Sequence, residues 1–174
     1  MNLQGKRVLV FGTGKSGIGA ADLLCETGAK VILFDGNEKT DKDAVLHKLS
    51  SGEGAEVYAG ELPKEVLDSL DLVVLSPGVP TDIPAVKKFY EMGLPVWGEV
   101  ELAYRTGKGR VLAITGTNGK TTTTALLGKI MSDAEDSVFV VGNIGTPYTS
   151  KALEMKENST TVAEISSFQL ETIE

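Results

Sequence analysis

Two glycine-rich segments of the sequence each follow an apolar run and precede a stretch with helical spacing. In the first, Gly12, Gly14 and Gly17 are spaced as GxGxxG, and in the second, residues 116–121 read Gly-Thr-Asn-Gly-Lys-Thr. Glycines let the backbone approach a phosphate closely, and the N–H groups that begin the following helix attract its negative charge. Both segments therefore predict phosphate-containing ligands.

The first segment has the spacing of a dinucleotide-binding loop. Asp35 ends the next apolar run, where a carboxylate can accept a hydrogen bond from a ribose hydroxyl. On the motif alone the ligand is NAD or FAD. The alternative is a tight strand-to-helix turn that binds nothing, because GxGxxG by itself is a weak signal.

The second segment has the groups of a triphosphate-binding loop. Backbone N–H groups and the Lys120 ammonium would contact phosphate, and the Thr121 hydroxyl would face Mg²⁺. The usual pattern requires glycine at position 114, where this chain has Ile114. This departure argues against an ordinary GTPase or kinase loop but retains every group that contacts phosphate. The alternative is a threonine-rich helix cap without a ligand.

Two further polar residues follow later apolar runs. Asn143 comes just after one run, and Glu164 lies near the end of another. Because ligands of open α/β sheets bind at the carboxyl ends of the strands, we expect Lys120, Thr121, Asn143 and Glu164 to converge. Glu164 is then a candidate ligand of Mg²⁺, which prefers hard oxygen donors. The alternative for Glu164 is an exposed carboxylate at a strand end.

These segments belong to a regular alternation of apolar runs and helical stretches, which predicts parallel sheets with right-handed crossovers. The predicted fold class is α/β, with a Rossmann-like parallel-sheet domain over residues 1–98. The start of a second, P-loop-type α/β domain, expected to be truncated, follows over residues 99–174; the family resemblance described below implies that this domain binds ATP. Strands are predicted within 6–12, 29–35, 69–78, 94–98, 110–114, 137–142 and 160–164, and helices within 16–28, 41–52, 83–93, 99–106 and 120–131.

Composition narrows the classes of partner and compartment. The formal net charge is -7, which argues against binding to nucleic acid or to an anionic membrane surface. A single cysteine, Cys25, excludes an internal disulfide, and we expect it to be a core residue. No signal peptide or run of about 18 apolar residues is present, which predicts a cytoplasmic location. His47 is expected to be a solvated surface residue and Trp97 a packing residue.

Five motifs together resemble the Mur ligase family, and in particular its branch that adds D-glutamate. The resemblance extends over essentially the whole chain and is specific through the combination and order of the motifs. They are GTGKSG (12–17), LSPGVP (75–80), TGTNGKTTT (115–123), GNIGTP (142–147) and EISSFQLE (164–171).

The resemblance implies that the first domain binds the uridine diphosphate part of a nucleotide sugar, with no nicotinamide involved. The segment DGN at 35–37 lacks the arginine or threonine that some members of the family have there. The residues implied to contact this substrate are Thr13, Gly14, Lys15, Ser16, Gly17, Asp35, Gly36, Asn37, Ser76, Pro77, Gly78, Asn143 and Gln169.

The resemblance also implies a reaction. ATP would phosphorylate the carboxylate of UDP-N-acetylmuramoyl-L-alanine, and the amine of D-glutamate would attack the acyl phosphate in peptidoglycan precursor synthesis. Lys120, Glu164 and Asn143 would be catalytic, with Mg²⁺ on Thr121 and Glu164. ATP would be bound by Gly116, Thr117, Asn118, Gly119, Lys120, Thr121 and Thr122.

Members of this family continue into a third domain, so we expect this chain to be a fragment that does not turn over alone. We expect no nucleic-acid partner, no membrane insertion and no obligate protein partner. Two other readings remain open. The chain is a nucleotide-sugar binding module in which residues 99–174 are partly disordered, or it is a nicotinamide-dependent enzyme, which leaves the loop at Lys120 unexplained.

Overall fold

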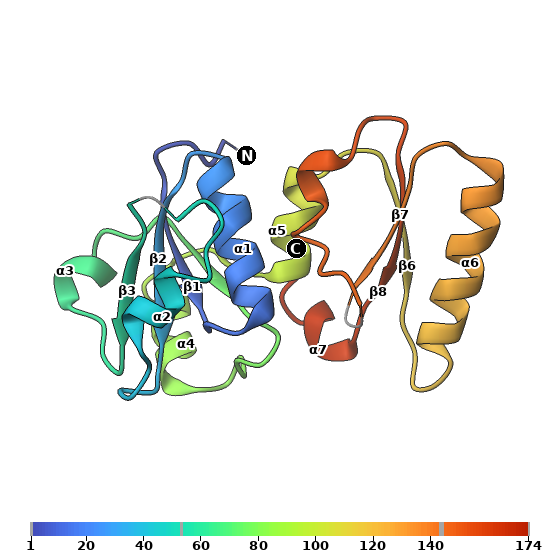
Figure 1. Cartoon of the computed structure of the whole chain (residues 1–174). Helices are drawn as coiled ribbons and strands as arrows, with labels where there is room; N and C mark the ends of the chain where they lie inside the picture. Colours follow the sequence, from blue (N-terminus) through green and yellow to red (C-terminus); the bar gives the residue numbers. More distant parts are fainter. Residues whose placement is uncertain (1, 53, 143–144, 174) are drawn as a thin grey trace. The chain divides into compact units, whose positions relative to one another are not determined.

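The structure is a computed structural model that describes residues 2–52, 54–142 and 145–173. The chain divides into two compact units, Met1–Glu99 and Val100–Glu174. The first unit therefore ends one residue later than the predicted domain 1–98. In both units strands alternate with helices (Figure 1). Every strand pairing is parallel, so the predicted α/β class is confirmed.

The first unit contains a five-stranded sheet in the order β3-β2-β1-β4-β5. Its central strands are buried on both faces, which explains why they read as continuous apolar runs such as VLVF and LVVL. The strands are β1 (Arg7–Phe11), β2 (Lys30–Asp35), β3 (Glu56–Ala59), β4 (Leu72–Leu75) and β5 (Val96–Gly98).

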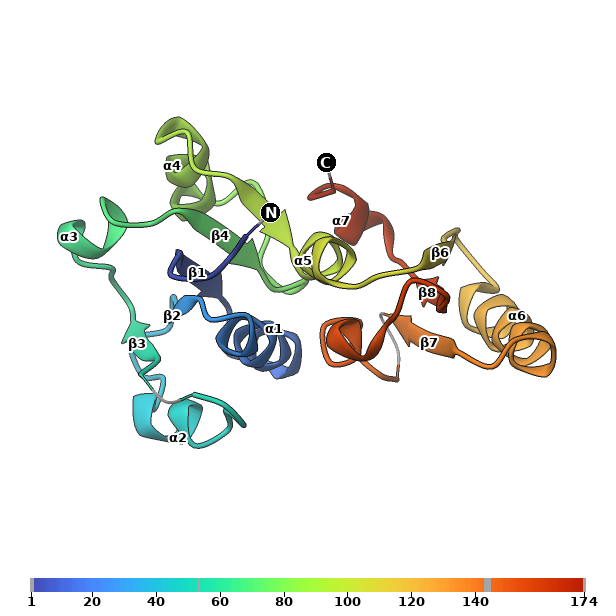
Figure 2. The same cartoon turned by 90° about the horizontal axis from the view of Figure 1, so that it is seen from above.

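Helices α1 (Lys15–Glu26) and α4 (Pro84–Glu91) lie on opposite sides of this sheet (Figure 2). The chain runs outward from β1 to β2 on one side and from β4 to β5 on the other. Strand order therefore reverses between β1 and β4, and the carboxyl ends of these strands form the topological switch point where open α/β sheets bind ligands.

Three elements of the first unit differ from the sequence prediction. Strand β3 and helix α3 (Lys64–Leu67) are not predicted, because four residues are too few to show a period. β3 is an edge strand without a fully buried residue, so its apolar signal is weak. Helix α2 (Lys42–Leu46) is shorter than the predicted stretch 41–52.

The second unit contains a three-stranded parallel sheet in the order β6-β8-β7. The central strand β8 is buried throughout, whereas β6 and β7 are partly exposed. A 3-10 turn (Ala152–Glu154) precedes β8 and is not predicted from the sequence. The main elements are α5 (Glu99–Thr106), β6 (Arg110–Ile114), α6 (Lys120–Ala134), β7 (Val138–Gly142), β8 (Thr160–Glu164) and α7 (Ser167–Leu170).

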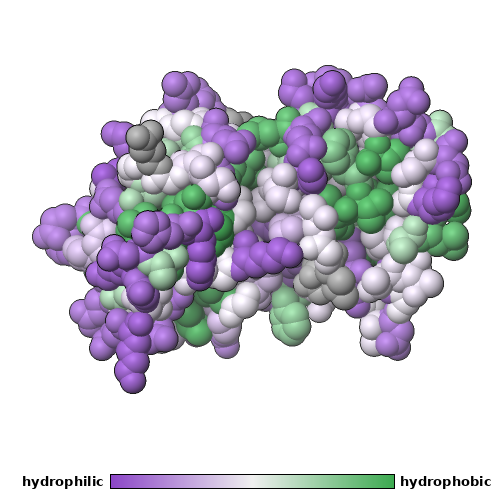
Figure 3. All heavy atoms as spheres, in the orientation of Figure 1, coloured by the Kyte–Doolittle hydropathy of each residue, from purple (hydrophilic) through white to green (hydrophobic). Residues whose placement is uncertain are grey.

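Large hydrophobic side chains are exposed on the second unit. Leu126 and Ile130 lie on α6, and Val140 lies on β7. Figure 3 shows hydrophobic surface on this part of the chain, between hydrophilic side chains. No helix of the described residues has the length and hydropathy needed to cross a membrane.

Asp71 links the amino-terminal ends of β1 and β4. Its carboxylate accepts hydrogen bonds from the Arg7 backbone N–H at 2.9 Å and from the Lys6 ammonium at 3.0 Å. Its own N–H donates to the Arg7 carbonyl at 2.9 Å. The bond from the Arg7 N–H, followed by that from Lys6, lowers the pKa of Asp71 below its usual value.

We expect the free energy of unfolding to depend on pH through Asp71, and Asp71→Asn to weaken this dependence. The pKa of Asp71 in the folded chain lies below its unfolded value of about 3.9. The stabilisation by its ionised carboxylate is therefore present above that value and is lost as pH falls through the folded pKa. The free energy of unfolding, measured by urea titration from about pH 5 downward, should fall less steeply in Asp71→Asn than in the parent. Asp68→Asn, at an exposed position, is the matched control. Equal slopes for Asp71→Asn and the parent would contradict the prediction.

Candidate functional site

The loop after β1 lines a cavity of about 400 Å³ at the switch point of the first sheet. The segment after β4 forms its other side, and Asp35 at the end of β2 also contributes. The cavity therefore brings together three segments that are far apart in the sequence. Of the predicted substrate residues, the lining contains Thr13, Gly14, Lys15, Ser16, Gly17, Asp35, Ser76 and Gly78.

Two glycines of this loop are required by close packing. A Cβ atom on Gly17 would lie 1.9 Å from the Gly12 carbonyl oxygen and 2.8 Å from Ser76 Oγ. Gly12 has a φ of +107°, and a Cβ there would lie 2.8 Å from Ser76 Cβ. Gly14, in contrast, has no atom within 4 Å of its ideal Cβ position, and it caps α1 without a side chain. Gly14 thus leaves the backbone open toward the cavity.

Asp35 connects the glycine loop to the turn after β2. Its carboxylate accepts from Thr13 Oγ1 at 2.5 Å and from the Asn37 N–H at 3.0 Å. Burial alone would raise the pKa of Asp35, but the hydrogen bonds from Thr13, Asn37 and Thr40 outweigh burial and lower it. The carboxylate is therefore held ionised as a hydrogen-bond acceptor.

Other predicted substrate residues lie outside this lining. Gly36, Asn37 and Pro77 are exposed and do not line the cavity. Gln169 is 5% exposed at the start of α7, where its side-chain oxygen accepts from the Ser166 N–H at 2.9 Å in a capping box. These four assignments, like those in the lining, remain predictions.

The second glycine loop connects β6 to α6. Gly116 and Gly119 have φ values of +146° and +77°, in the range that favours glycine. The Lys120 ammonium donates to the Gly116 carbonyl at 2.8 Å, so it lies across the loop. Helix α6 has no side-chain cap, which leaves the N–H groups of its first turn without such an acceptor. Residues 117–119, 121 and 122 are exposed.

Glu164 ends β8 at the same edge of the second sheet. It pairs in register with Ile114 on one side and with Gly142 on the other, and it is 3% exposed. A Cβ on Gly142 would lie 2.2 Å from the Glu164 carbonyl oxygen, so only glycine fits there. The end of β8 therefore lies directly beside the start of the loop at 115–119. Asn143, predicted to join this set, lies outside the described residues.

The donors present suit Mg²⁺ better than a soft metal. Thr121 and Glu164 offer hydroxyl and carboxylate oxygen, the hard ligands that Mg²⁺ accepts together with water and phosphate. Among residues 2–52, 54–142 and 145–173, no group of three or more His, Cys, Asp or Glu side chains is placed to hold a metal ion. A metal at this edge would therefore take most of its ligands from bound phosphate and water.

Both units match known family models. The model for the Mur ligase MurD-like N-terminal domain matches residues 6–98, and that for the Mur ligase middle domain matches residues 114–174. The chain belongs to the Mur ligase family.

Curated Mur ligases are similar over the whole chain. It is 56% identical to the UDP-N-acetylmuramoylalanine--D-glutamate ligase of Lachnospira eligens over 99% of its length. It is 54% identical to the protein of the same name from Lachnoclostridium phytofermentans over 100% of its length. The chain spans 38% of the length of each of these relatives.

A solved Mur ligase structure shares the fold. The murein peptide ligase mpl from Psychrobacter arcticus superposes with a TM-score of 0.52 at 21% identity. The match covers 93% of this chain and 37% of that one. At this identity the likeness concerns the fold alone.

Three residues of this Mur ligase chain are expected to have no catalytic role, and their burial differs. His47 is exposed at the end of α2. Cys25 is half-buried on α1 and not in the core, so the expected core position is wrong. Burial, followed by the charges of Asp22 and Glu26, raises the pKa of its thiol. Trp97 is 2% exposed in β5, as expected of a packing residue.

Two cavity residues of the Mur ligase fold were not predicted from the sequence. Phe11 and Val79 line the cavity of the first glycine loop beside its polar groups. Phe11 also packs against Phe34, with ring centroids 4.7 Å apart. An apolar residue looks the same in the sequence whether it faces a cavity or the core, so no local signal identified them.

The two loop glycines should respond differently to a methyl group. We expect Gly17→Ala to lower the free energy of unfolding by about 1–3 kcal/mol, because the added Cβ meets backbone that cannot yield cheaply. Gly14→Ala should cost less than about 1 kcal/mol, the usual cost of losing a good N-cap residue. Urea titration of both variants measures the difference. Equal losses would show that the close approach of Gly17 to Gly12 does not constrain the fold.

Proposed function

We propose that this chain forms the substrate-binding domain and part of the ATP-binding domain of a D-glutamate-adding ligase. The whole enzyme would join D-glutamate to UDP-N-acetylmuramoyl-L-alanine at the expense of ATP. The observation that carries the proposal is the cavity at the switch point, lined by GTGKSG, Asp35, Ser76 and Gly78. The identity to relatives with that printed name supports the choice of substrate.

In the first unit, the pyrophosphate would lie at the amino terminus of α1. The first-turn N–H groups there have no side-chain cap, and no atom lies within 4 Å of the ideal Cβ position of Gly14. Asp35, oriented by Thr13 and Asn37, would accept a hydrogen bond from a sugar hydroxyl. Gly36, Pro77, Asn143 and Gln169 complete the proposed substrate set.

In the second unit, residues 116–122 would bind the phosphates of ATP. Lys120 is positioned across the loop, where its charge offsets that of the transferred phosphoryl group. Thr121 and Glu164 would hold Mg²⁺, which when bound neutralises charge on phosphate oxygens. Asn143 would orient the substrate carboxylate.

The proposed reaction makes an amide from a carboxylate that is a poor acyl donor. A carboxylate oxygen attacks the γ-phosphorus of ATP, and ADP leaves. The amine nitrogen of D-glutamate then attacks the acyl carbon, phosphate leaves, and the nitrogen loses a proton. We place this reaction in the cytoplasm, in peptidoglycan precursor synthesis and hence in cell-wall biogenesis, cell shape and division. The proposed partners of the enzyme are small-molecule substrates, and no protein partner is proposed.

Titration calorimetry tests the first site. We expect the 174-residue chain to bind UDP-N-acetylmuramoyl-L-alanine and not NAD in the same buffer. Gly14→Val should abolish the heat, because its side chain fills the space next to the helix terminus. Lys48→Val, at an exposed position outside the cavity lining, is the control.

Each other result has a definite meaning. Binding of NAD alone would replace the ligase proposal with a nicotinamide-dependent one. Heat from neither ligand would show that this chain alone does not hold the substrate. An unchanged affinity in Gly14→Val would remove the first glycine loop from the site.

Amide chemical shifts test the second site. Adding MgATP to the chain should shift the amides of residues 116–122, and Lys120→Ala should weaken this binding by about tenfold or more, as expected for loss of a charge-assisted bond. Lys129→Ala, an exposed position on the same helix, should leave it unchanged. Equal effects of the two variants would exclude a specific role for Lys120.

A further inference from the structure

A second cavity, of about 360 Å³, lies in the first unit at the carboxyl ends of β2 and β3. It shares no lining residue with the cavity of the first glycine loop. We propose that this cavity is a separate binding site for a small aromatic carboxylate whose ring carries an N–H donor. This proposal does not depend on the ligase activity.

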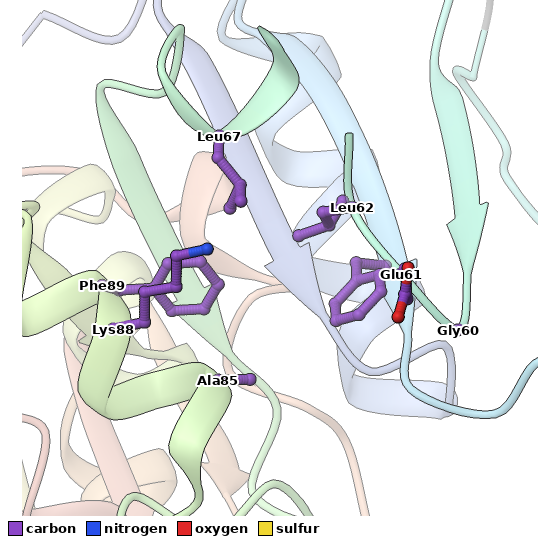
Figure 4. A pocket seen from close by; sticks show the side chains of 8 residues that line it. Gly60, Glu61, Leu62, Leu67, Ala85, Lys88 and Phe89 are labelled. Atoms are coloured by element: carbon purple, nitrogen blue, oxygen red, sulfur yellow. The ribbon is translucent and has the colours of Figure 1, made fainter. Parts of the chain in front are cut away.

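The inner wall of the cavity is aromatic and rigid. Phe34 and Phe89, which line it, are 4% and 1% exposed and belong to the hydrophobic core. Leu62 and Leu67 add apolar surface from the segment after β3 and from α3 (Figure 4). A flat apolar ring is removed from water when it lies against these walls.

The rim of the cavity carries one charge of each sign. Figure 4 shows the side chain of Lys88, from α4, on one side and the carboxylate of Glu61, from the segment after β3, on the other. Within residues 2–52, 54–142 and 145–173, neither side chain forms an ion pair. A ligand with an anionic group at one end and an N–H at the other complements both.

The size of the cavity limits the class of ligand. Small-molecule sites usually measure about 300–1,000 Å³, so this one accepts one or two fused rings. A polar donor at the far end from the carboxylate would reach Glu61 without displacing the core. Indole-5-carboxylate has this arrangement, with its ring nitrogen and its carboxylate at opposite ends.

The cavity also has a defined connection to the proposed substrate site. Phe34 lines it, whereas Phe11 lines the other cavity, and the two rings lie in contact. The Gly60 N–H donates to the Asp35 carbonyl at 2.8 Å, so the second cavity also borders the strand end that carries Asp35. The two cavities are thus neighbours separated by one aromatic pair.

The test is a titration of the 174-residue chain with indole-5-carboxylate, followed by amide chemical shifts. We expect saturable shifts centred on Gly60, Lys88 and Phe89. Lys88→Gln should weaken binding about two- to fivefold, the range of an exposed ion pair. Lys87→Gln, the adjacent exposed lysine that does not line the cavity, should leave it unchanged.

Two comparisons locate the other end of the ligand. 1-Benzofuran-5-carboxylate, which lacks the N–H, should bind about two- to fivefold more weakly than the indole, the usual size of one exposed polar contact. In Glu61→Gln this preference should shrink, whereas in Glu65→Gln, an exposed position outside the lining, it should persist.

Filling the cavity provides an independent variant. Ala85 lines it from α4, and Ala85→Phe should reduce binding more than tenfold while circular dichroism shows an unchanged fold. If that variant does not fold, the ligand affinities of Lys88→Gln and Lys87→Gln test the proposal without it. The proposal is overturned by the absence of saturable shifts, by shifts centred on other parts of the chain, or by equal effects of the two lysine variants.

Discussion

The close contact between Gly12 and Gly17 is the constraint on which the first unit depends. A Cβ on Gly17 would lie 1.9 Å from the Gly12 carbonyl, so the start of α1 sits directly against the end of β1. Ser76, just after β4, completes the contact, and its hydroxyl donates to the Gly12 carbonyl at 3.3 Å. One compact arrangement thereby fixes the two strand ends that flank the switch point together with the helix terminus between them. The cavity between these segments is a consequence of this packing.

The second unit also contains a tight glycine contact, but this contact does not lie in the glycine loop. There, the tight contact lies between two strand ends, because a Cβ on Gly142 would lie 2.2 Å from the Glu164 carbonyl oxygen. The glycine loop itself is open, since the ideal Cβ of Gly119 has no atom within 4 Å. Its shape depends on positive φ angles and on the bond from Lys120 to the Gly116 carbonyl. A ligand can therefore compete for Lys120, whereas the contact around Gly12 is part of the packed fold.

The sequence predicted those features that depend on neighbouring residues alone, namely the buried strands and the glycine loops. The strands around Val10 and Val74 are buried on both faces and show it as unbroken apolar runs, and both glycine loops follow from residue type and spacing. β3 was missed because a short, half-exposed edge strand carries little pattern. The bond between Thr13 and Asp35 joins residues 22 positions apart, and the contact of Phe11 with Phe34 joins neighbouring strands. No single segment contains such information, so the cavities emerge only from the assembled sheet.

The helix ends would let a chain of net charge -7 hold the proposed anionic ligands. α1 and α6 have neither a side-chain cap nor an acidic residue in the first turn. By contrast, α2 is capped by Asp41 and α7 by Ser166, and α3 has Glu65 in its first turn. Helix α4 also lacks a cap and an acidic residue there, but it begins with Pro84, which has no N–H to offer. A side-chain cap would occupy the N–H groups that a phosphate needs, and an acidic residue would repel it. Attraction at the two proposed phosphate sites is therefore local and built from oriented N–H groups, whereas the long-range field of the chain opposes the approach of an anion.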